Sequence, residues 1–89
     1  MNKTYTIGYC PVCNTHGKME LLFDKTTNKI IAMCDECDLE FSCVSDYQSN
    51  MNGRRNYFDA ESHSKLPIAR IATLDEIKNT EWYPFIKIL

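Results

Sequence analysis

The sequence predicts a small α+β domain in which a three-stranded antiparallel sheet is followed by a polar loop and a short C-terminal helix. Three observations support this fold class. Short stretches alternate apolar with polar residues, two Cys-x-x-Cys pairs bracket the most regular of these stretches, and a helix-capping sequence lies near the C-terminus. A chain of 89 residues buries only a modest core, so a domain of this size often needs an additional staple.

The two Cys-x-x-Cys pairs predict where that staple lies. The first pair is Cys10 and Cys13, the second is Cys34 and Cys37, and 20 residues separate the pairs. A two-residue gap lets one tight turn direct both sulfurs to one point, while the long gap lets the chain return as a hairpin. Four thiolates can then surround one Zn²⁺ ion tetrahedrally and leave no open coordination position. The sequence therefore predicts one structural zinc ion rather than a catalytic one.

Strand-like alternation surrounds both cysteine pairs. Residues 18–23 and 29–33 are expected to form a hairpin across the polar turn at 24–28, and residues 39–43 are expected to add a third strand. Residues 3–9 carry Tyr, Ile and Tyr at alternate positions, which suggests a short strand leading into the first pair. The hairpin would bring both pairs to its open end.

Residues 9–44 resemble a zinc ribbon, and the four cysteines match the positions of its ligands. The whole chain is also similar to small bacterial proteins that combine a CPxC…CxEC ribbon with a short C-terminal helix ending near Trp82. Some of those proteins resemble immunity proteins, which neutralise a partner toxin. The resemblance implies a zinc-stapled ribbon that binds another protein, for example a basic toxin domain. Because one fold serves many functions, the ribbon alone does not fix the partner.

Three further residues could contribute to metal or thiol chemistry. Cys43 is expected to be a small buried apolar residue on the strand face shared with Leu39 and Phe41; the alternatives are a replacement ligand or a reactive thiol. His16 follows the first cysteine pair and could ligate zinc, but with four cysteines present a surface or hydrogen-bonding role is favoured. His63 lies in a polar stretch and is expected to have no chemical role.

The chain divides into three stretches that we expect to form one compact domain. Residues 1–44 are the predicted zinc ribbon, residues 45–65 are a polar connecting segment, and residues 66–89 hold a helix and an apolar tail that packs on the ribbon. The sequence Thr-Leu-Asp-Glu that begins at Thr73 is a capping box. It predicts a short helix that runs to about Thr80.

Two groups of residues are candidates for a partner-binding surface. The first mixes basic with aromatic side chains in the polar segment, and the second is the apolar tail. Such residues are enriched at interface hot spots. The alternatives are a solvated loop for the first group and packing against the sheet for the second. The candidates are Arg54, Arg55, Tyr57, Phe58, Trp82, Tyr83 and Phe85.

The sequence carries no set of residues that indicates catalysis. It lacks a Ser/His/Asp arrangement, a carboxylate pair in an identifiable pocket and a Gly-rich loop that could cradle phosphate. We therefore expect a non-enzymatic, zinc-binding protein-interaction module that acts as an immunity protein or toxin inhibitor. The alternative is a nucleic-acid-binding zinc ribbon in transcription or RNA processing.

Charge and location separate these two functions. The formal net charge is -2, and four thiolates with one Zn²⁺ add a further -2, which gives about -4 in the zinc form. That charge disfavours nucleic acid, whose non-specific binding depends on a positive surface. We expect a cytoplasmic protein, because the start lacks the apolar stretch of a signal peptide, no transmembrane run is present, and five cysteines make an odd number for a disulfide framework.

Overall fold

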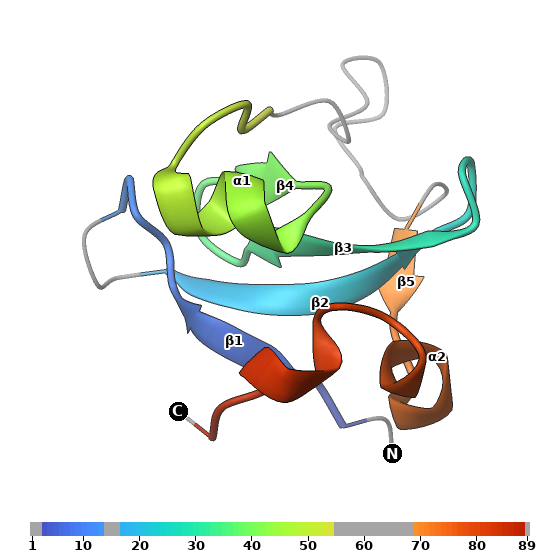
Figure 1. Ribbon diagram of the computed structural model, residues 1–89. Helices are drawn as coiled ribbons and strands as arrows, with labels where there is room; N and C mark the ends of the chain where they lie inside the picture. Colours follow the sequence, from blue (N-terminus) through green and yellow to red (C-terminus); the bar gives the residue numbers. More distant parts are fainter. Residues whose placement is uncertain (1–2, 14–16, 55–68, 89) are drawn as a thin grey trace.

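The computed structural model describes residues 3–13, 17–54 and 69–88. Within them, one five-stranded antiparallel sheet is accompanied by two short α-helices and one 3-10 helix (Figure 1). The strand order is β1-β2-β3-β4, and β5 pairs with β2. The strands are β1 (Thr6–Tyr9), β2 (Lys18–Asp24), β3 (Lys29–Cys34), β4 (Glu40–Phe41) and β5 (Ala69–Ile71), and the helices are α1 (Val44–Ser49), α2 (Leu74–Lys78) and η1 (Tyr83–Phe85).

The predicted central hairpin is confirmed. β2 and β3 pair without interruption from Met19 opposite Cys34 to Asp24 opposite Lys29. The side chain of Asp24 closes the turn, because one carboxylate oxygen accepts the N–H of Thr26 at 2.8 Å and the other accepts the hydroxyl of Thr27 at 2.9 Å. The hairpin ends at its open side with Cys34, so the register itself carries the second cysteine pair to its place.

β1 departs from the predicted regular strand. Its register against β2 shifts between Thr6 and Tyr9, and Gly8 inside this irregularity has a φ of 150°. Such a backbone conformation suits glycine and is typical of a bulge. The bulge reverses the facing of the next residue, so Ile7 is buried whereas Tyr9 is 44 % exposed. The expected alternation of Tyr5, Ile7 and Tyr9 on one face is therefore wrong at Tyr9.

The predicted three-stranded sheet is too small. β1 pairs with the part of β2 that includes Lys18 and Glu20, while β5 pairs with Leu22 to Asp24 further along. β3 occupies the other edge of β2 throughout, so β1 and β5 lie end to end along one edge. β5 was not predicted because three residues are too few to show a strand period.

The larger apolar core lies on one face of the sheet. On β2, Met19 and Leu21 are fully buried and Phe23 packs against them, which confirms the predicted alternation. Residues of the C-terminal segment complete this core, with Ile77 and Trp82 both buried. The opposite face carries a second, smaller cluster formed by Leu22, Ile31, Met33 and Ala69.

α1 occupies the start of the stretch expected to be a polar connecting segment. Its buried residue is Val44, and the ring of Tyr47, one turn later, packs edge-on against Phe41 with 5.7 Å between ring centroids. These two side chains give the segment an apolar face despite its polar composition. α1 ends at Ser49, and the next residue, Asn50, has a left-handed φ of 53° that is typical of a helix C-terminal cap.

The capping box of the C-terminal helix is confirmed. The hydroxyl of Thr73 accepts the N–H of Glu76 at 3.3 Å, and the carboxylate of Glu76 accepts the N–H of Thr73 at 2.9 Å. The helix ends at Lys78 rather than near Thr80. After η1, Lys87 pairs with Thr6 of β1. Within the described part of the chain, no helix has both the length and the apolar character needed to cross a membrane.

Candidate metal centre

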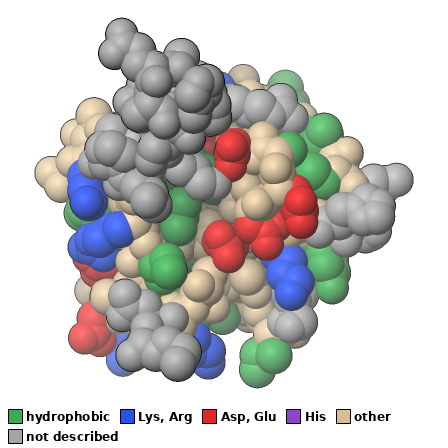
Figure 2. All heavy atoms as spheres, turned by 180° about the vertical axis from the view of Figure 1, so that it is seen from behind, with side chains coloured by type: hydrophobic (Ala, Val, Ile, Leu, Met, Phe, Trp, Pro, Cys, Tyr) green, Lys and Arg blue, Asp and Glu red, His purple; other side chains and the backbone are tan. Residues whose placement is uncertain are grey.

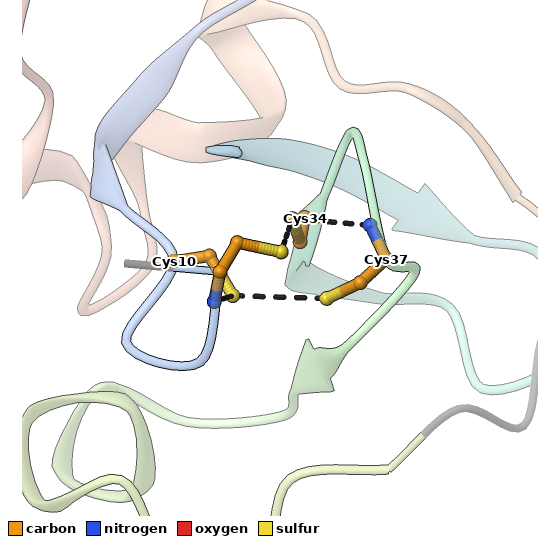
Figure 3. A group of neighbouring side chains, drawn as sticks. Cys10, Cys34 and Cys37 are labelled. Atoms are coloured by element: carbon orange, nitrogen blue, oxygen red, sulfur yellow. Dashed lines mark hydrogen bonds between the residues drawn. The ribbon is translucent and has the colours of Figure 1, made fainter. Parts of the chain in front are cut away.

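The four cysteines of the two pairs converge at one end of the hairpin. Cys10 and Cys13 lie in the turn after β1, and Cys34 and Cys37 lie in the turn that begins at the end of β3. Figure 3 shows Cys10, Cys34 and Cys37 directed toward one another from these two loops. All four Sγ atoms lie within 4.8 Å of one another. We call the two loops the first knuckle (residues 10–13) and the second knuckle (residues 34–37).

The distances between sulfurs fit tetrahedral coordination. The Sγ atoms of Cys10 and Cys37 are 3.8 Å apart, and those of Cys13 and Cys34 are 3.6 Å apart. A tetrahedron with Zn–S bonds of about 2.3 Å has edges of about 3.8 Å. All of these cysteines are free thiols. The four side chains can therefore coordinate one metal ion, and the arrangement on an antiparallel sheet is like that of a zinc ribbon.

The two knuckles repeat the same local geometry. In the first, the N–H groups of Val12 and Cys13 both donate to the Sγ of Cys10 at 3.4 Å. In the second, the N–H groups of Glu36 and Cys37 donate to the Sγ of Cys34 at 3.3 and 3.4 Å. N–H groups aimed at sulfur stabilise its negative charge. In both pairs the backbone thus turns two N–H donors toward the sulfur of the first cysteine.

Gly17 allows the chain to pass close to the sulfur cluster. A Cβ atom added there would lie 2.1 Å from the Sγ of Cys34 and 3.3 Å from the Cβ of Glu36. The carbonyl of Gly17 accepts the N–H of Cys10 at 2.8 Å, which ties the start of the first knuckle to the strand that follows it. No larger residue fits this position without moving a ligand.

The second knuckle is fixed to β2 and to its own exit strand. Asp35 donates its N–H to the carbonyl of Lys18 at 3.0 Å, and its carboxylate accepts the N–H of Lys18 at 2.9 Å. Cys34 donates its N–H to Leu39 at 2.8 Å, and Asp38 adopts a left-handed φ of 62° between them. These contacts hold both cysteines of the pair against the end of the hairpin.

Tyr47 joins α1 to the first knuckle. Its hydroxyl donates to the carbonyl of Tyr9 at 3.1 Å, next to Cys10, and a Cβ on Gly8 would lie 2.6 Å from that hydroxyl. Burial, with a smaller contribution from Cys10, raises the pKa of Tyr47 above its usual value. Tyr47 thus remains a protonated donor. Its role was not foreseen, because nothing in the sequence links position 47 to position 9.

Without a cation, the surroundings of Cys13 and Cys34 disfavour their thiolate forms. Hydrogen bonding with Cys37, followed by burial, holds the pKa of the Cys13 thiol far above its ordinary value. Burial likewise raises the pKa of Cys34. A bound divalent cation reverses this preference, since its charge compensates the thiolates. Metal binding and deprotonation of the cluster are therefore coupled.

Cys43 does not belong to the core or to the cluster. It is half-buried, precedes α1 as its N-terminal cap position, and its Sγ lies 3.4 Å from the hydroxyl of Ser45. The expectation of a buried residue on the face of Leu39 and Phe41 is wrong, because β4 ends at Phe41 and the chain turns into the helix. His16 and His63 lie outside the described residues.

The candidate partner-binding residues that the structure describes do not form one surface. Arg54 is exposed and its backbone pairs with Glu40 in β4, at one edge of the sheet. Tyr83, which is 45 % exposed, belongs to the segment whose Lys87 pairs with β1, at the opposite edge. Phe85 is half-buried against the core. Three further candidates lie outside the described residues: Arg55, Tyr57 and Phe58.

Trp82 cannot serve as an exposed anchor. Its side chain is 2 % exposed, and its Nε1 donates to the carbonyl of Ile30 inside the core. The alternative reading of the tail, packing on the sheet, holds for this residue. Trp82 therefore supports the fold rather than a contact surface.

No family model, curated protein or solved structure matched this chain. The assignment of the centre therefore depends on the geometry of the cysteine cluster itself.

Proposed function

We propose that the chain is a zinc-stapled module that binds another protein. The observation that carries the metal assignment is the pair of sulfur–sulfur distances across the knuckles, 3.8 and 3.6 Å. A tetrahedral set of four sulfurs selects zinc or iron among the common metals. We assign zinc rather than iron, because Zn²⁺ has no redox chemistry and so needs no electron-transfer partner. Four protein ligands leave no place for water or substrate, so the ion would be structural.

The surface around the knuckles supports a protein partner. Two apolar side chains near the first knuckle are exposed, Tyr9 at 44 % and Val12 at 52 %. The second knuckle carries exposed acidic residues, Asp35 and Glu36. Figure 2 shows that Asp and Glu side chains gather on the face seen from behind. Exposed apolar side chains near acidic residues favour a partner of opposite charge, because such charge speeds encounter and sets orientation.

The finer proposal is an inhibitor that neutralises a basic toxin, as an immunity protein does. It is supported by the acidic balance of the chain, -2 before any metal is bound, and by the resemblance of the sequence to such proteins. An acidic inhibitor and a basic enzyme attract one another over a distance of about one Debye length, roughly 8 Å at physiological salt.

The metal assignment is tested by measuring zinc in protein purified without added metal. We expect one zinc per chain, complete loss in Cys34→Ser, and full retention in the matched control Cys43→Ser, since Cys43 lies outside the cluster. Removing zinc with a chelator should unfold the hairpin end, because metal binding is part of the folding free energy. A chain that keeps its melting temperature after chelation would contradict the assignment.

The partner class is tested with the acidic second knuckle. The double variant Asp35→Asn/Glu36→Gln removes two charges and keeps similar shapes. We expect it to slow association with a basic partner recovered from the native host and to reduce the salt dependence of that association. The control is Glu81→Gln, an exposed acidic residue near the C-terminus. Equal effects of the two changes would argue against the knuckle as the contact.

A further inference from the structure

The four sulfurs of the metal centre are not equivalent. The first cysteine of each knuckle is the inner one: Cys10 is 2 % exposed and Cys34 is 0 % exposed. Each of them accepts two backbone N–H groups. The second cysteine of each knuckle, Cys13 or Cys37, is only half-buried. The centre thus has an inner pair enclosed by the fold and an outer pair that reaches the surface.

This difference predicts different reactivity toward soft electrophiles and oxidants. Attack on a thiolate requires access to its sulfur and depends on how much negative charge that sulfur holds. The inner sulfurs are covered by the core and share their charge with four N–H donors. Cys13 and Cys37 are each partly exposed to solvent. Reagents should therefore meet the outer pair first.

We propose that Cys13 and Cys37 form a redox-sensitive pair, which a low-molecular-weight disulfide converts into a Cys13–Cys37 disulfide with release of the metal. The proposal rests on the zinc centre put forward above. All four sulfurs lie within 4.8 Å, so the outer two can join after a small movement. Because they come from different knuckles, the new bond would keep the two knuckles together once the ion has left.

The reaction balances as two thiol–disulfide exchanges. In the first, the sulfur of Cys13 attacks one sulfur of the reagent, forms a mixed disulfide and expels half of the reagent as a thiolate. In the second, the sulfur of Cys37 attacks the sulfur of Cys13 and expels the other half as a thiolate. The protein loses two electrons and the reagent gains two. The centre then retains two thiolates, too few to hold a tetrahedral ion.

Cys34 is the main competitor for the second step, since its Sγ is 3.6 Å from that of Cys13. Two observations favour Cys37 instead. The sulfur of Cys34 is buried and is held by the N–H groups of Glu36 and Cys37. Leaving those donors would cost the second knuckle two hydrogen bonds, and Cys37 is the more exposed of the two cysteines.

The first experiment maps access. The zinc-loaded protein is treated briefly with iodoacetamide and the labelled positions are located by tandem mass spectrometry. We expect label at Cys13 and Cys37 before Cys10 and Cys34. The variant Cys43→Ser, which lies outside the cluster, removes the fifth thiol without touching the centre and should give the same order. Label appearing first on an inner sulfur would overturn the proposal.

The second experiment follows oxidation itself. Zinc content is measured first, and a chain without zinc contradicts the metal assignment alone. The zinc-loaded Cys43→Ser protein is then mixed with oxidised glutathione while a chromogenic chelator reports released metal. We expect loss of one zinc per chain in step with a Cys13–Cys37 disulfide, and recovery of zinc binding after reduction. A bond between Cys13 and Cys34, a bond within one knuckle, or retention of the zinc would overturn the proposal while leaving the centre established.

Discussion

The indole Nε1 of Trp82 donates a hydrogen bond to the carbonyl of Ile30 over 3.1 Å. β4 pairs with β3 only at Ala32 and Met33, so the ladder from that edge stops short of Ile30. The indole N–H therefore donates to the carbonyl of Ile30 the hydrogen bond that a longer β4 would have donated. A residue 52 positions away in the chain thus completes the strand at the end opposite the knuckles.

Replacing Trp82 by Phe tests this relationship. The ring keeps most of its packing, but the carbonyl of Ile30 loses its donor in a buried place. We expect a loss of about 1–3 kcal/mol in the free energy of unfolding, with zinc stoichiometry unchanged because Trp82 is not part of the four-cysteine cluster and its hydrogen bond is to Ile30, at the far end of β3. Chemical denaturation of the zinc-loaded proteins gives the number. The exposed neighbour Tyr83→Phe is the control and should change stability little.

The strands that were predictable from the sequence are those with enough residues to show a period. β2 has seven residues with apolar side chains at alternate positions, β3 has six residues that are mostly apolar, and polar residues mark the turn between them. β5 has three residues and β4 has two, so tertiary pairing rather than local pattern decides them. α1 was not predicted, for a related reason. Its apolar face consists of Val44 and Tyr47 alone, and Tyr47 is held in place by tertiary contacts with Phe41 and Tyr9 that the local sequence does not reveal.

Gly17→Ala should damage the metal centre through shape alone. The added methyl group would lie 2.1 Å from the Sγ of Cys34, so either the knuckle or the strand must move. We expect a destabilisation of about 1–3 kcal/mol, as for overpacking elsewhere, together with faster transfer of zinc to a competing chelator.

Gly53→Ala is the matched control for that effect. A Cβ there would lie 2.9 Å from Leu39 Cδ1 and 3.1 Å from Phe41 Cε1, which is also too close but involves no ligand. We expect a comparable loss of stability without faster zinc transfer. If both variants release zinc at the same rate, the effect of Gly17 is general loosening and not a distortion of Cys34.

The convergence of the four cysteines was predictable, because two short spacings and one long one favour a single cluster. The supports of the ligands were not. Gly17 carries no motif, and its importance follows from the distance to Cys34. The partner-binding candidates were drawn from residue type alone, which cannot separate an exposed Tyr83 from a buried Trp82 in the same short run.

Glu76 of α2 forms an ion pair with Arg70 of β5. This pair makes the free energy of unfolding depend on pH in the acid range. Its carboxylate accepts two hydrogen bonds from the guanidinium of Arg70 at 2.9 and 2.5 Å, and this contact lowers the pKa of Glu76 from 4.5 to about 2. A depressed pKa means that the stabilisation is complete above about pH 4.5 and is lost as the pH falls toward 2. The pair is open to solvent, so solvent screening keeps its contribution to stability small.

Glu76→Gln should remove this dependence while keeping the cap, since Gln also completes a capping box. We expect the variant to be less stable than the parent at neutral pH and the gap to close between pH 4.5 and 2. Acid also releases metal from thiolates, so the readout is the difference between the two proteins at each pH. The control is Asp75→Asn. Asp75 forms an exposed ion pair with Lys78 at 3.8 Å, and we expect this variant to be as stable as the parent at each pH.

We expect this chain to bind nucleic acid no more tightly than an unrelated acidic protein does. The chain has a formal net charge of -2, and binding to a phosphate backbone relies on cations that displace its counterions. We expect dissociation constants no lower than the non-specific range of about 10⁻⁴–10⁻⁶ M for mixed-sequence duplex or single strands at physiological salt. Arg54→Ala should change nothing in that titration, because one exposed cation does not offset the net negative charge of the chain. Binding well below that range, with a steep loss on raising salt and a further loss in Arg54→Ala but not in Lys25→Ala, would instead favour a nucleic-acid-binding ribbon.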